Sequence, residues 1–195
     1  MVNKRHLLRI ALAFACMLTA TSAFAQTRDV SLLYGISAGG GKRLVSGTLE
    51  LGARPAGVVP PEPDDRAIGA LALTVGARYR DRVALLAFWD QNFSGSEDDG
   101  HWGTGDIHAS ARVWLTRGLW AEAGGGASML GYKPPTQIST TITRDWSPGF
   151  NAAVGLDVIE TPRVAIGIFG RYMRATFHGQ AIQHVSLQVE LMGRK

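Results

Sequence analysis

Apolar and polar residues alternate with a period of two along most of the chain beyond residue 42. The clearest stretch is 105–116, where even-numbered positions from Asp106 to Trp114 are mostly polar and odd-numbered ones from Ile107 to Leu115 are apolar. This period is typical of a β-strand whose two faces meet different surroundings. The same alternation predicts strands at seven further stretches, 43–54, 68–79, 82–93, 119–131, 147–158, 163–174 and 184–191.

The connections between these strands alternate in length. Short polar turns are expected at 80–81, 116–118 and 160–162, and longer loops at 55–67, 93–104, 132–146 and 175–181. In bacterial outer-membrane barrels the turns facing the periplasm are short and the extracellular loops are long. Strands of about 10 residues are also long enough to cross a bilayer. The sequence therefore predicts an all-β, antiparallel transmembrane β-barrel of eight strands.

Two segments leave the strand count open. Residues 29–41 also alternate, and we interpret them as a periplasmic lead-in or as part of a longer first strand. The β-branched run from Ile138 to Thr143 would give ten strands if it pairs. A soluble β-sandwich or a lipocalin-like cup also has alternating strands. Here, however, the polar faces carry many charges beside Gly and Ala, which favours lipid outside and a polar, side-chain-filled interior.

Aromatic residues near the predicted strand ends are typical of a membrane-interface girdle. They are Trp89, Phe93, Trp114, Trp120, Tyr132, Trp146 and Tyr172. With this organisation the chain resembles the small outer-membrane β-barrel superfamily, which includes the transmembrane domain of outer-membrane protein A and its eight-stranded relatives. The resemblance covers nearly all of 43–193 and rests on architecture rather than on a motif. The chain departs from it by running on to Met192–Lys195 instead of ending on an aromatic residue.

The resemblance implies a place in the bacterial cell envelope rather than a particular activity. We expect the outer membrane as the location, and outer-membrane lipid, lipopolysaccharide and the barrel-assembly machinery as partners. We also expect a monomer that binds no cofactor.

The first 25 residues have the features of a secretory signal peptide. Basic residues at Lys4, Arg5 and Arg9 precede an apolar run, and Ala23-Phe24-Ala25 offers a cleavage site before residue 26. Cys16 as a lipoprotein acylation site is the alternative, although the bulky residue two positions before it fits poorly. The predicted organisation is a signal peptide at 1–25, a lead-in at 26–42 and an outer-membrane barrel at 43–195.

Removal of the signal peptide changes the charge and the cysteine content. Three of the 20 basic residues leave with it and all 16 acidic ones stay, so 17 cations face 16 anions. This near balance gives no basic patch of the kind that binds nucleic acid. The single Cys lies in the signal peptide, so the mature chain is expected to contain no disulfide and no thiolate metal site.

Phosphate-loop and metal-loop motifs are incomplete. The Gly39–Lys42 segment lacks the earlier glycine and the following Ser or Thr of a phosphate loop, and Gly124–Gly126 lacks a third spaced glycine. An acidic stretch of Glu97, Asp98, Asp99 and His101, with Asp106 near it, offers hard oxygen ligands for a divalent cation. It lacks the spacing of a Ca²⁺ loop, so a solvated extracellular loop is the favoured interpretation and no metal is expected.

His184 and Ser186 are the best catalytic candidates. Barrel lipid hydrolases place a His and a Ser two positions apart on a strand, with a carboxylate that orients the His. Glu190 lies six residues from His184, which is roughly 20 Å along a strand. The pair also falls on the inner face, whereas a lipid substrate approaches from outside. An enzyme is therefore the less favoured interpretation.

The charges on the inner faces have a structural explanation. An eight-stranded barrel is just wide enough for side chains to fill it, and buried charges persist only when they are paired. We therefore expect a lumen charge network formed by Glu50, Arg78, Arg112, Glu122, Asp157, Arg171 and Glu190. The resulting functional hypothesis is a structural or surface-interaction barrel with a mostly closed lumen. A narrow porin-like channel for small solutes or ions is the first alternative, and a lipid-modifying enzyme is the second.

Overall fold

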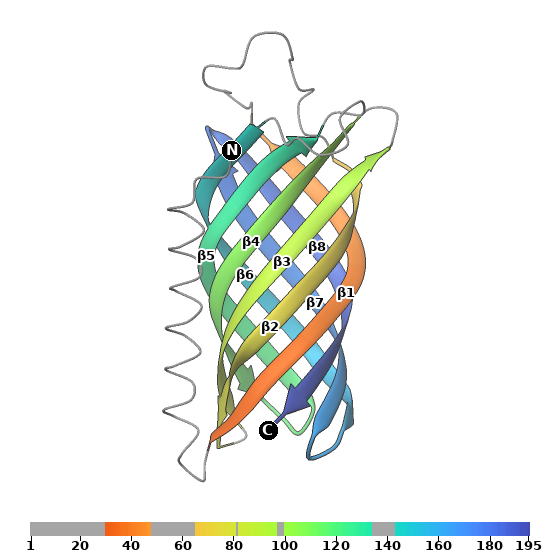
Figure 1. Ribbon diagram of the computed structural model, residues 1–195, viewed down its shortest axis with the longest axis vertical. Coiled ribbons are helices and arrows are strands. Elements are labelled where there is room, and N and C mark those ends of the chain that lie inside the picture. Colours follow the sequence, from red (N-terminus) through yellow and green to blue (C-terminus); the bar gives the residue numbers. More distant parts are fainter. Residues whose placement is uncertain (1–29, 48–64, 81, 97–99, 134–142) are drawn as a thin grey trace.

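The computed structural model describes residues 30–47, 65–80, 82–96, 100–133 and 143–195. These residues form a closed antiparallel barrel of eight strands (Figure 1). In chain order the strands are β1 (Val30–Ser46), β2 (Ala67–Tyr79), β3 (Val83–Ser96), β4 (Gly100–Trp114), β5 (Leu119–Lys133), β6 (Thr143–Glu160), β7 (Val164–Phe177) and β8 (Gln180–Arg194). Each strand pairs with the next, and β8 pairs back onto β1. The predicted all-β barrel of eight strands is confirmed.

The first strand begins before the stretch at 43–54. β1 covers residues 30–46, which agrees with the interpretation of 29–41 as part of a longer first strand and not with a lead-in. Of the stretch predicted at 43–54, residues 43–46 belong to β1 and residues 48–54 lie outside the described residues. β1 pairs with β2 on one edge and with β8 on the other. The glycine run at 39–41 interrupts the alternation within this strand. At Gly39 and Gly41 a Cβ atom would overlap the backbone of β8, so these glycines allow close approach of the two strands.

The outward face of the barrel is apolar and exposed. On β3 Leu85 exposes 69% of its surface, and on β8 Leu187 exposes 64%. Exposed aliphatic and aromatic side chains occur on all eight strands. Soluble monomers rarely expose apolar patches larger than a few hundred Å², so an apolar belt around a closed barrel matches a hydrocarbon surrounding and not water. In contrast, the inner face combines buried polar and charged side chains with two buried apolar clusters, one around Trp120 and Phe169 and one around Trp102 and Phe177.

Several aromatic residues of the predicted girdle point inward. Trp89, Phe93 and Trp146 are exposed on the outer face, but Trp114, Trp120 and Tyr132 are buried inside the barrel. For these three the girdle prediction is wrong. The physical reason is the strand period, because Trp114 and Trp120 share the parity of inward polar residues on their own strands.

Two of the predicted long loops are largely strand. β7 and β8 are joined through His178 and Gly179, whose positive φ angles of 44° and 87° suit a two-residue hairpin turn. The loop predicted at 175–181 is thus a tight turn. Likewise, β3 continues to Ser96 and β4 begins at Gly100, although a loop was predicted at 93–104. Polar and glycine-rich composition indicated loops there, but a polar lumen accepts such residues on the inner face of a strand.

Candidate functional site: the ion-paired lumen

Strand register brings the first ion pair of the lumen together. Arg112 on β4 and Glu122 on β5 are direct cross-strand partners, and both side chains point inward. The Nε of Arg112 donates a hydrogen bond to Glu122 Oε2 over 2.9 Å. Ser110, one inward position away on β4, donates from its hydroxyl to Glu122 Oε1 over 3.0 Å. The hairpin of β4 and β5 therefore fixes the carboxylate of Glu122 from two sides.

Arg112 also reaches across the barrel to β8. Its two terminal nitrogens donate to the two carboxylate oxygens of Glu190, over 2.7 Å and 3.2 Å. This fork-to-fork geometry is the strongest form of an Arg–carboxylate pair. The guanidinium carbon of Arg112 lies 3.7 Å from the ring centroid of Trp120, which covers its face. Arg112 thus joins two carboxylates from different walls of the lumen.

A second arginine extends the same cluster to β3 and β7. Arg171 donates to Asp90 Oδ2 over 3.0 Å and lies 3.5 Å from Glu122 Oε1. Its guanidinium lies over the rings of Phe88 and Phe169, at 4.2 Å and 4.9 Å from their centroids. We call the five residues joined in this way the central network. They are Asp90, Arg171, Glu122, Arg112 and Glu190.

The central network is almost fully removed from solvent. Each of its five side chains exposes 3% or less of its surface. The network links β3, β4, β5, β7 and β8 through side chains that point into the lumen. Charges without water are stable only when opposite charges and hydrogen bonds compensate them. Here the two guanidinium groups are interleaved with three carboxylates.

The structure brings together four of the seven residues predicted for the lumen network. Arg78 and Asp157 point inward but lie nearer the end that carries the short turns. Arg78 pairs with Glu160 at 3.4 Å, and Asp157 accepts hydrogen bonds from the indole N–H groups of Trp114 and Trp120. Glu50 lies outside the described residues.

Asp90 is the member of the central network that the alternation of polar residues did not indicate. The alternation at 82–93 placed Leu85, Ala87 and Trp89 on the lipid side, which by parity turns Asp90 inward. The residue was overlooked because its inward neighbours Leu86 and Phe88 are apolar, so the face did not look polar. Parity alone would have identified it.

The catalytic candidates do not form a hydrogen-bonded triad. His184 and Ser186 are buried on the inner face of β8. The Nδ1 of His184 contacts the hydroxyl of Thr104 at 3.4 Å, while the hydroxyl of Ser186 accepts a hydrogen bond from Gln188. Glu190 is held by Arg112. Each group therefore has a structural partner of its own.

The candidate metal loop yields no site among the described residues. Glu97, Asp98 and Asp99 lie outside them, and His101 falls at the beginning of β4. No cluster of three or more His, Cys, Asp or Glu side chains suited to a metal ion occurs in the described part of the chain. No helix within the described ranges has the length and apolarity needed to cross a membrane.

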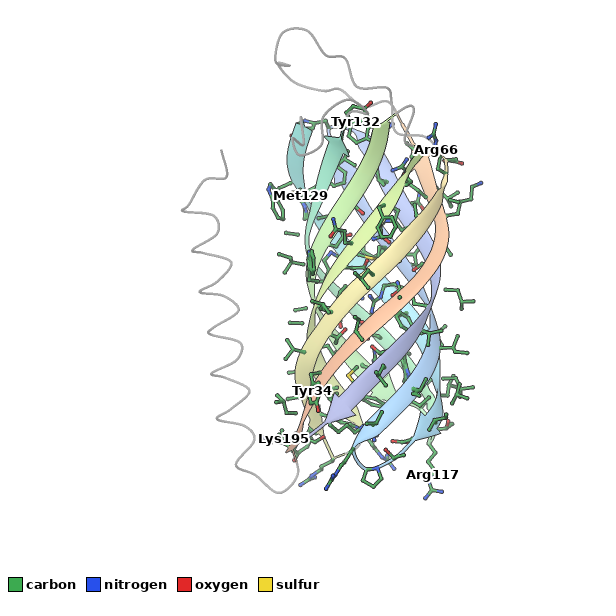
Figure 2. All side chains as sticks on the ribbon, turned by 45° about the vertical axis from the view of Figure 1, so that its right-hand side comes forward. Tyr34, Arg66, Arg117, Met129, Tyr132 and Lys195 are labelled. Atoms are coloured by element: carbon green, nitrogen blue, oxygen red, sulfur yellow. The ribbon has the colours of Figure 1, made fainter. Side chains whose placement is uncertain are left out.

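A wide cavity opens below the central network, at the end of the barrel that carries the short turns. Its volume is about 1440 Å³, and we call it the vestibule. Trp114 and Glu160 form part of its wall. Figure 2 places Arg117 and Lys195 at this end and Tyr132 at the other. On the far side of the network, a space of about 10 Å³ lies beside Thr104 and His184.

The closed barrel, its apolar outer belt and its charged core define the class of small transmembrane β-barrels, and solved structures agree. The fold is similar to that of Neisserial surface protein A, with a TM-score of 0.54, 13% identity, and coverage of 82% of this chain and 95% of that one. It is also similar to the attachment invasion locus protein Ail of Yersinia pestis, solved with the heparin analogue sucrose octasulfate. That comparison has a TM-score of 0.50 and 12% identity, and it covers 83% of this chain and 98% of Ail.

No family model matches the sequence, and no curated protein matches it closely. The similarity is therefore one of architecture: the chain has the fold of the small eight-stranded outer-membrane barrels.

Proposed function

We propose that the protein is an outer-membrane β-barrel with a closed lumen, which acts through its surfaces and connecting segments and not by catalysis or bulk transport. The observation that carries this proposal is the central network, because five paired and buried ionic side chains occupy the lumen. A lumen wide enough to pass small solutes would expose the five side chains of the central network to water. The apolar outer belt supports lipid as the surrounding medium.

A surface-interaction role is supported by the fold neighbours. One is named a surface protein and the other an attachment invasion locus protein. In both comparisons most of this chain aligns with nearly all of the neighbour. We extend from these neighbours to this chain only a general role. The barrel anchors the protein in the outer membrane, and its connecting segments face the cell exterior. The short turns then face the periplasm, with the vestibule opening on that side.

A narrow ion path is the second candidate function. The observation that favours it is the set of paired charges inside the lumen, together with the vestibule that opens at one end of the barrel. Conduction would require both the central network and the buried apolar clusters of the lumen to rearrange. The two candidates differ in what the unmodified protein does in a membrane, so electrical recording separates them.

The test is single-channel recording of the purified protein in planar bilayers. We expect no conductance steps from the unmodified barrel and measurable steps from the double variant R112S/E190S, in which two long side chains of the central network are shortened. A matched control is K42Q, which also removes one partner of an ion pair. Lys42 is exposed at the barrel end away from the vestibule, and its ammonium lies 3.9 Å from Asp65. Steps of defined size from the unmodified protein would overturn the closed-lumen proposal and favour the channel.

A further inference from the structure

Seven of the fifteen residues that line the vestibule carry cationic side chains. Arg80 and Arg82 lie in the turn between β2 and β3, Arg117 lies in the turn between β4 and β5, and Arg163 directly precedes β7. All three short turns at this end of the barrel therefore contribute arginine to one cavity. The inner wall and the end of the chain add three further cations, Arg78, Arg194 and Lys195.

Carboxylates do not balance this charge. Glu160 is the one carboxylate that lines the vestibule among the described residues. It accepts hydrogen bonds from Arg194 over 2.7 Å and from Arg78 over 3.4 Å, so two arginines share a single oxygen atom. Arg82, Arg117, Arg163 and Lys195 form no ion pair with any described residue. Arg194 also lies 4.0 Å from a carboxylate oxygen of Asp157. Among the described residues that line the cavity, cations thus outnumber carboxylates.

One buried donor in the wall also has no acceptor. The Nε of Arg194 is shielded from solvent, and no hydrogen-bond partner for it occurs within the described ranges. A buried guanidinium nitrogen without an acceptor is costly. An anion in the vestibule would offer oxygen atoms to this nitrogen and to the surrounding guanidinium groups.

The turns hold their arginines on a fixed frame. The hydroxyl of Thr116 accepts the N–H of Leu119 over 3.2 Å, beside Arg117. The hydroxyl of Thr161 accepts the N–H of Val164 over 2.9 Å, beside Arg163. The backbone at both positions is therefore set before any ligand binds, which lowers the entropy cost of binding.

We propose that the vestibule binds a phosphate-bearing anion with two or more negative charges. Arginine forks match phosphate oxygens in pairs, and a concave cavity with charge of one sign concentrates counter-ions. Its volume of about 1440 Å³ has room for more than one phosphate group. The shared chemistry fits a soluble diphosphate or the headgroup of an anionic phospholipid at the rim. This proposal goes beyond the function proposed above and does not depend on whether the lumen conducts.

The first experiment is calorimetric titration of the full chain, in nanodiscs of phosphatidylcholine, with inorganic diphosphate. The test variant R117Q/R163Q removes two exposed turn arginines. The matched control K42Q/R174Q removes two exposed cations away from the vestibule. We expect saturable binding to the unmodified protein, at least tenfold weaker binding to R117Q/R163Q, and less than a twofold change in the control. Heat-dependent gel migration of each variant verifies that the barrel is intact.

The second experiment distinguishes the two sources of phosphate. The thermal unfolding midpoint is compared between nanodiscs of phosphatidylcholine and nanodiscs that also contain phosphatidylglycerol. Saturable diphosphate binding that R117Q/R163Q loses supports a soluble ligand. Stabilisation by phosphatidylglycerol that R117Q/R163Q loses supports a lipid headgroup. Absence of both effects in the unmodified protein, or equal losses in K42Q/R174Q, overturns the proposal and leaves the arginines as a solvated rim.

Discussion

Replacement of Arg112 by methionine tests whether the lumen is closed to water. Methionine keeps much of the length of the arginine side chain and removes its charge. In the R112M variant Glu190 loses both hydrogen bonds from Arg112, and the structure gives it no other ion-pair partner among the described residues. Glu122 still lies 3.5 Å from Arg171 and accepts a hydrogen bond from Ser110. The variant therefore leaves one carboxylate buried and uncompensated.

The burial of this pair sets the size of the expected effect. The side chains of Arg112 and Glu190 expose 2% and 3% of their surfaces. Removal of one partner of a buried ion pair costs about 3–5 kcal/mol, whereas a solvent-exposed pair contributes about 1 kcal/mol or less. If the lumen is closed, R112M should lower the free energy of unfolding by the larger amount. In the double variant R112M/E190M no carboxylate is stranded, so much of that stability should return.

The assay is urea unfolding of the barrel in lipid vesicles, followed by tryptophan fluorescence, for R112M, E190M and R112M/E190M. We expect a coupling free energy between the two positions of about 2 kcal/mol or more, because they act as one pair. A loss of less than about 1 kcal/mol in R112M, with no recovery in the double variant, would contradict a lumen closed to water. That result would mean that water reaches the central network.

Three further predictions concern the wall of the barrel, each measured as the change in urea midpoint in vesicles. Gly126→Ala should destabilise the barrel by about 1–3 kcal/mol, because its Cβ would overlap the carbonyl of Ile107. As a control, Gly105→Ala should cost under about 0.5 kcal/mol, because its Cβ would meet its nearest neighbour at 3.5 Å. Equal losses in the two variants would contradict a role for close packing at Gly126. Leu187→Arg should cost about 2–4 kcal/mol in lipid, and an unchanged midpoint would mean that this exposed position does not face hydrocarbon. Gly179→Ala should cost about 1–2 kcal/mol, because φ is 87° there, and a neutral result would place the residue in another conformation.

The strand period made most of the barrel predictable from sequence. Inward polar and outward apolar residues follow strictly at 105–116, and the structure reproduces both faces of β4. The same period turns Arg112, Glu122, Arg171 and Glu190 inward, although each lies on a different strand. Alternation indicates which face of a strand a residue occupies, but it does not indicate which residue lies opposite across the lumen. The ion-pair partners could therefore be identified only from the strand register in the structure.

The failures of prediction arise where the local pattern and the tertiary surroundings disagree. The glycine run at 39–41 weakens the alternation of β1, yet contact with β8 requires small residues there. Trp114 and Trp120 looked like interface residues by type, but their indole N–H groups donate to Asp157 inside the barrel. A bulge between Asp157 and Ile159 further shifts the register of β6 against β7, which no simple period predicts. The vestibule was also invisible, because its arginines come from turns far apart in sequence.

The most direct test of a membrane-spanning barrel is gel migration of the protein from an outer-membrane fraction, with and without boiling. A closed barrel whose strands pair around the full circle should stay folded in cold detergent and migrate differently after boiling. We expect this shift for the protein in the outer-membrane fraction. Recovery of the protein in the soluble periplasmic fraction, with one migration position at both temperatures, would contradict the membrane-spanning barrel.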